Sequence, residues 1–77
     1  MRFPDRETVK TIRSTYPKGT RVVLVEMDDP QVPLPGTEGT VLGVDDTGSL
    51  IMRWDDGSGL NVVWGEDVVR KAGADDD

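Results

Sequence analysis

Four acidic pairs are the residues of this chain with the most obvious chemical potential. They are Asp28-Asp29, Asp45-Asp46, Asp55-Asp56 and Glu66-Asp67. Adjacent carboxylates can bind a divalent cation or share general acid and base roles. Three of the four pairs, however, lie beside glycine in predicted turns, where an aspartate side chain accepts hydrogen bonds from backbone N–H groups. None has the ligand spacing of an EF-hand calcium loop, so we predict that these carboxylates stabilise turns.

The rest of the chain lacks the residues that usually accompany carboxylates in catalysis. It has no histidine and no cysteine, which excludes imidazole acid–base chemistry, thiolate nucleophiles, disulfides and the usual zinc sites. No Walker sequence or dinucleotide-binding glycine pattern is present. We therefore predict a protein that is not an enzyme, with no catalytic, cofactor-binding or metal-binding residues and no cofactor.

Charge and hydropathy limit the partners and the location. Fifteen acidic residues against nine basic ones give a net charge of −6, which repels phosphate backbones, so no direct nucleic-acid binding is expected. No segment approaches the roughly 20 apolar residues of a membrane-spanning helix, and the N-terminus has no signal-peptide core, so no membrane contact is expected. The absence of cysteine fits a reducing compartment, and we predict a cytoplasmic location.

The stretch 35–64 is predicted to form the centre of the fold. Turn-forming residues at 45–48 and 55–59 separate apolar runs, which predicts three short strands joined by two tight turns. Gly43 is predicted to form a bulge, because Val41 and Val44 cannot share a face of a regular strand. A loop at residues 55–59 sets these cross-strand pairs: Trp54 with Leu60, Arg53 with Asn61, Met52 with Val62, Ile51 with Val63 and Leu50 with Trp64.

The segments around this centre are predicted to cover it. A helix over about residues 5–16, capped by Asp5, would pack on the sheet through Val9, Ile12 and Tyr16. A strand over residues 20–27 would point Val22 and Leu24 inward, and a proline-rich loop would follow at 28–36. A turn at 65–67 and a strand at 68–70 would return the chain to pair with the first strand. We predict a single domain over residues 1–70 and a disordered acidic tail over 71–77.

Short motifs along the chain resemble a known family. They are YPKGTRV at 16–22, MDDP at 27–30, PGTEGTV at 35–41, VDDTG at 44–48, WDDG at 54–57 and GED at 65–67. In this order they resemble a family of small bacterial and phage domains of unknown function. The resemblance covers roughly residues 7–70 and implies a mainly β fold, a small SH3-like barrel of about five antiparallel strands with one short N-terminal helix. Members of that family occur often in phages and other mobile elements, and the resemblance brings no activity with it.

The chain departs from that family pattern at Ile51 and Trp64, where a polar residue and a proline or small residue are expected. Ile51 and Val63 would be neighbours on the outer face of the second hairpin, and a bulge at Gly43 would turn Leu42 toward them. Exposed apolar patches larger than a few hundred Å² often mark protein-binding sites. The alternative is that Trp64, like Trp54, lies in the core. The predicted protein-binding residues are Ile51, Val63, Trp64, Leu42 and Arg53.

Two functions follow from these observations. The first is a non-enzymatic protein-binding module, a phage or mobile-element adaptor or an inhibitor of a host protein, whose patch could also form a homodimer. The alternative is an acidic decoy whose carboxylates imitate nucleic-acid phosphates and block a DNA- or RNA-binding enzyme. Deleting the acidic tail should weaken a decoy and leave a patch binder almost unchanged.

Overall fold

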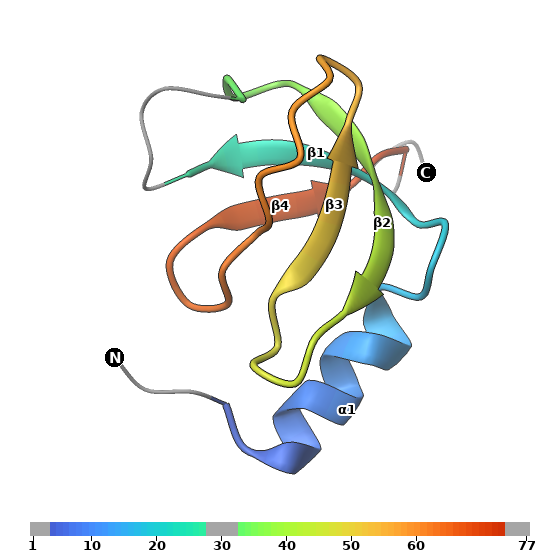
Figure 1. Ribbon diagram of the computed structural model, residues 1–77, viewed down its shortest axis with the longest axis vertical. Coiled ribbons are helices and arrows are strands. Elements are labelled where there is room, and N and C mark those ends of the chain that lie inside the picture. The colour runs from blue at the N-terminus through green and yellow to red at the C-terminus, as the bar shows by residue number, and fades with distance from the viewer. Residues whose placement is uncertain (1–3, 28–32, 74–77) are drawn as a thin grey trace.

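The computed structural model describes residues 4–27 and 33–73. A helix, α1 (Arg6–Thr15), precedes four strands, β1 (Arg21–Glu26), β2 (Glu38–Val44), β3 (Leu50–Trp54) and β4 (Val68–Lys71). The strands form one antiparallel sheet in the order β3-β2-β1-β4. Figure 1 shows β1 and β4 lying across the direction of β2 and β3, with α1 at one end of the sheet. The fold is therefore mainly β, as predicted, with one N-terminal helix and a barrel-like sheet that does not close.

The helix begins and packs as its sequence predicts. Asp5 is the N-cap, and its Oδ1 accepts a hydrogen bond from the Thr8 amide at 2.8 Å, which satisfies one of the free N–H groups of the first turn. Val9 and Ile12 are buried, and Tyr16 packs partly buried against the core. A helix of three turns is marginal in water, so this apolar stripe is what holds α1 on the sheet.

The core is built from the inward residues of the strands. Val22 and Leu24 of β1 are fully buried, as predicted. Trp54 is 1% exposed, and its indole N–H donates to the Leu60 carbonyl oxygen at 2.7 Å. Its ring covers Gly39, the residue paired with it on β2. A Cβ added at Gly39 would lie 2.6 Å from an indole carbon, so only glycine lets the tryptophan sit so close to the backbone.

The predicted bulge in β2 is confirmed. Val41 pairs with Met52 and Gly43 pairs with Ile51, which leaves Leu42 as the extra residue between them. The bulge resets the alternation of side chains, so that Val41 is buried and Val44 also packs against the core. Leu42 is turned outward and exposed, as a bulge at this point requires.

The prediction of a full strand after the second turn is wrong, because the described residues there form a single bridge to β3. The turn closes after three residues, because the Trp54 amide donates to the Ser58 carbonyl and the Asp56 side chain accepts from the Ser58 amide. This shifts the register by two residues. A single bridge then joins Leu50 to Val62, through N–H···O bonds of 2.9 and 3.0 Å.

Side chains, and not the facing backbone, form hydrogen bonds with two backbone groups of this region. The Asn61 Oδ1 accepts from the Met52 amide at 3.2 Å, and the Trp54 indole N–H donates to the Leu60 carbonyl oxygen. The predicted pairs of Met52 with Val62 and of Ile51 with Val63 therefore do not form. The described part of the chain has four strands instead of about five.

The return of β4 to β1 is confirmed. Val23 pairs with Arg70 and Leu24 pairs with Val69. The predicted start of the tail at residue 71 is wrong: Lys71 belongs to β4, and the next amide, that of Ala72, donates to the Arg21 carbonyl. Residues 28–32 of the predicted proline loop and 74–77 of the predicted tail lie outside the described residues. Within the described residues, no helix is long and apolar enough to cross a membrane.

Candidate functional site

A cavity of about 270 Å³ lies where the sheet does not close. Its walls come from both ends of the sheet, since Leu50 and Val62 form one side and Val68 and Val69 of β4 form another. The apolar stripe of α1 closes one end. We call this cavity the seam groove and define it by Ile12, Tyr16, Leu50, Val62, Trp64 and Val69.

Trp64 is the residue of the seam groove that solvent reaches most readily. Its side chain is 42% exposed, so the expectation that it lies in the core is wrong. The turn that follows fixes its backbone, because the Asp67 carboxylate accepts from the Val63 amide at 2.8 Å. The amides of Glu66 and Asp67 both donate to the Val63 carbonyl. Trp64 is thus held at the start of a closed turn, with its side chain free to contact another molecule.

Gly48 brings the helix end and Trp64 close together. It has a positive φ of 82° in the turn between β2 and β3, a conformation that favours glycine. A Cβ added there would lie 2.8 Å from a Pro4 ring carbon, 3.2 Å from an Ile12 methyl and 3.7 Å from the Trp64 Cβ. The absence of a side chain at Gly48 is therefore what lets the N-terminal segment, α1 and Trp64 converge.

The five residues predicted to bind a protein fall into two groups. Leu42 and Ile51 are exposed on the outer face of β2 and β3, where Arg53 is also exposed and paired with Thr40. Trp64 instead lies beside Leu50 on the other side of β3, in the seam groove. Val63, the residue before Trp64, is half-buried and starts the turn described above, so it belongs to neither group. The predicted patch is therefore not continuous.

Sequence reasoning missed the other residues of the seam groove. The sequence places Tyr16 at the contact between helix and sheet and Leu50, Val62 and Val69 in strands, and it predicts no cavity among them. The cavity arises because residues 60–64 touch β3 at one bridge and not along a full ladder. That depends on side-chain hydrogen bonds of Asn61 and Trp54, which no apolar pattern reports.

One carboxylate of each described acidic pair stabilises a turn, as predicted. Asp45 Oδ1 accepts from the Thr47 hydroxyl at 2.7 Å and from the amides of Thr47 and Ser49 at 3.0 and 2.9 Å. These bonds, that of the Thr47 hydroxyl above all, lower the pKa of Asp45 below its usual 3.8, because they favour the charged form. Asp56 and Asp67 accept backbone N–H groups in the same way. Asp28 and Asp29 lie outside the described residues.

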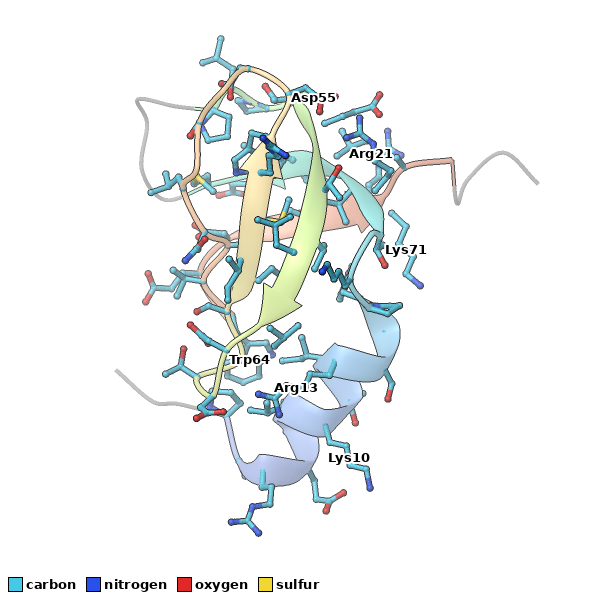
Figure 2. The ribbon with its side chains drawn as sticks, turned by 45° about the vertical axis from the view of Figure 1, so that its right-hand side comes forward. Lys10, Arg13, Arg21, Asp55, Trp64 and Lys71 are labelled. Atoms are coloured by element: carbon cyan, nitrogen blue, oxygen red, sulfur yellow. The ribbon has the colours of Figure 1, made fainter. Side chains whose placement is uncertain are left out.

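The described residues offer no group of three or more acidic side chains placed to hold a metal ion together. Each carboxylate discussed above serves its own turn, and the turns lie at different points of the fold. In Figure 2, Asp55 lies near the top of the molecule, close to Arg21 and away from Trp64, which lies lower, just above α1. The arrangement therefore offers an apolar contact surface at the seam groove, with charged side chains around it.

Comparisons with known proteins define the family without adding an activity. Neither the search of curated proteins nor the search of solved structures found a match. The family described as domain of unknown function (DUF4314) matches residues 5–72. This span contains α1, all four strands and every residue of the seam groove. The chain therefore belongs to this family of domains of unknown function (DUF4314).

Proposed function

We propose that the chain is a non-enzymatic protein-binding module whose small SH3-like barrel holds an extended apolar segment of a partner protein in the seam groove. The observation that carries the proposal is Trp64, which is 42% exposed at a cavity lined mainly by apolar residues, with Asp67 as the one charged side chain among the described residues that line it. Tryptophan is enriched at the energetic centres of interfaces, because one ring buries a large area at little entropic cost. At about 270 Å³, the cavity suits one or two apolar side chains better than a whole small molecule.

The free edge of β4 supports an extended partner segment. Within the described residues, β4 is the last strand in the sheet order and pairs with β1 alone. Such an edge presents backbone N–H and C=O groups that a second chain can use. Val68 and Val69 of this strand also line the cavity. A segment added along β4 would therefore place alternate side chains against Trp64 and Val62.

The biological setting is part of the proposal and rests on the family resemblance. A small protein-binding barrel from a phage or mobile element would act in the cytoplasm as an adaptor or as an inhibitor of a host protein. The acidic decoy receives less support. Asp45, Asp56 and Asp67 each accept backbone N–H groups in turns, so these carboxylates are not arranged as a free array.

A random peptide library displayed on phage tests the proposal. The wild-type chain should select extended peptides rich in apolar residues, with dissociation constants in the micromolar range. Trp64→Ala should weaken binding of the selected peptides about tenfold or more, since interface tryptophans often contribute about 2 kcal/mol. Leu42→Ala is the matched control, because Leu42 is equally exposed but lies on the outer face. Failure to select any peptide, or equal binding by wild type and Trp64→Ala, would refute the proposal.

A further inference from the structure

Three basic side chains follow one side of α1. Arg6, Lys10 and Arg13 are four and three residues apart, so they fall within a narrow arc of the helix. They line a second hollow, of about 570 Å³, together with Pro4, Val9 and Asp46. We call it the basic hollow and define it by Arg6, Lys10 and Arg13.

Two of these three cations form no ion pair with another described residue. The Arg13 guanidinium donates to the Val44 carbonyl at 3.2 and 3.3 Å and to Asp46 Oδ1 at 3.1 Å, which fixes it against the turn between β2 and β3. Within residues 4–27 and 33–73, Arg6 and Lys10 have no ion-pair partner. Among the described residues that line the hollow, Asp46 is the one carboxylate. A chain with a net charge of −6 thus has a locally positive surface.

The basic hollow adjoins the seam groove. Pro4 lines the basic hollow, and Ile12 and Trp64 line the seam groove. These three residues meet above Gly48, where an added Cβ would be 2.8 Å from Pro4 and 3.7 Å from Trp64. In Figure 2, Arg13 lies on α1 beneath Trp64, and Lys10 lies about one turn closer to the N-terminus of the helix. One bound segment can therefore contact both hollows.

We infer that the partner segment carries acidic residues beside its apolar anchor, with the anchor in the seam groove and the carboxylates over Arg6 and Lys10. This rests on the proposed function. From Arg6 to Lys10 the helix rises about 6 Å, and alternate side chains of an extended peptide are spaced about 6.7 Å apart. Two acidic residues at alternate positions match that length. A nucleic-acid strand fits less well, because its phosphates continue past the hollow toward an otherwise acidic surface.

The test uses the tightest peptide from the library and a neutral version in which Asn and Gln replace every Asp and Glu. Binding of the fluorescein-labelled peptides is measured by anisotropy in about 20 and about 150 mM NaCl. The charge reversals Arg6→Glu and Lys10→Glu, alone and combined, are compared with Lys18→Glu, which changes the net charge as much as either single reversal but lies outside the basic hollow. Circular dichroism confirms folding, and Arg6→Gln/Lys10→Gln replaces the combined reversal if it unfolds. A labelled twelve-residue oligothymidylate serves as the nucleic-acid probe.

At low salt, the neutral peptide should bind the wild type about tenfold more weakly, and the combined reversal in the hollow should weaken the acidic peptide about tenfold. Both losses should shrink at higher salt, and the control variant should change binding less than twofold. Equal losses in the single reversals and in the control variant, no acidic residues among the selected peptides, or tighter binding of the oligonucleotide would overturn the inference. If Trp64→Ala abolishes binding while the hollow variants do not, the proposed function stands and only the inference fails.

Discussion

The Arg21 guanidinium forms a two-point ion pair with the Asp55 carboxylate, Nη1 donating to Oδ1 at 2.9 Å and Nη2 donating to Oδ2. Arg21 starts β1, and Asp55 follows β3, so the pair reaches across β2. On the way, Arg21 also donates to the Thr40 hydroxyl and to the Glu38 carboxylate. The ion pair thus ties the turn after β3 to the start of β1. The hydrogen bonds from Arg21 lower the pKa of Asp55.

Stability should fall in acid because of Asp45 and Asp55. Both have a pKa in the folded state below the usual 3.8, so the unfolded state takes up protons first. Their contribution is therefore complete above about pH 4 to 5 and is lost as the pH falls through the lowered values. Urea unfolding measured from pH 7 to pH 2.5 should show this decline.

Asp55→Asn should be less stable than the wild type at pH 7 and should lose less stability on acidification. Glu26→Gln is the control, since Glu26 is an exposed acid on the same strand as Arg21. It should follow the wild-type pH profile. An Asp55→Asn curve parallel to that of the wild type would show that the ion pair does not contribute to folding.

Gly39→Ala should destabilise the fold by about 1–3 kcal/mol, as overpacked core substitutions do. The new methyl group would meet the Trp54 ring at 2.6 Å and the Met52 terminal methyl at 3.0 Å. Gly59→Ala is the matched control, since an added Cβ there meets nothing within 4 Å. Thermal unfolding should show a lower midpoint for Gly39→Ala alone. Equal midpoints would mean that the indole does not pack on β2 as described.

Ile12→Ala should cost about 2–4 kcal/mol, because a buried aliphatic side chain is removed from the contact between α1 and the sheet. A domain of this size has little stability to spare, so partial unfolding at 37 °C is expected. Thr11→Ala, on the exposed side of the same helix turn, should change the free energy of unfolding by less than about 0.5 kcal/mol. Equal effects of the two substitutions in urea unfolding would show that the helix does not depend on its apolar stripe.

The two tryptophans should differ in fluorescence. Trp64 is 42% exposed and Trp54 is 1% exposed, so the wild-type emission should contain a red-shifted part that acrylamide quenches readily. Trp64→Phe should remove that part and leave a blue-shifted, poorly quenched spectrum from Trp54. Uniform quenching of the wild type, with no change in shape in the variant, would place Trp64 inside the core after all.

The sequence predicts the elements of this fold well and the candidate site poorly. Asp5, the stripe at Val9 and Ile12, and the bulge beside Gly43 are local signals, and each acts in the structure through the local physics that predicted it. The register after Trp54 depended on the length of one turn. Asp55-Asp56-Gly57 allowed a three-residue or a five-residue loop, and the Asp56 hydrogen bond to Ser58 selects the shorter one.

That single choice displaced the predicted binding patch. With the shorter turn, Ile51 is paired with Gly43 on β2 and has no cross-strand contact with Val63. Trp64 was identified because it departs from the family pattern, but its surroundings were not. They come from α1, β4 and the turn at Gly48, which are far apart in the sequence. The spacing of apolar residues predicts which face of one helix or strand is buried. It cannot predict a cavity that forms between several elements.

The pairing of β4 with β1 implies a definite order of folding. The hairpin of β2 and β3 closes over a three-residue turn at 46–48 and can form within microseconds, whereas joining Val22 to Lys71 requires closure of a loop that contains most of the chain. The wall of the seam groove that β4 provides should therefore be the last to assemble and the first to open. Amide hydrogens of β4 should exchange with solvent sooner than those of Val41 and Met52 at the centre of the hairpin.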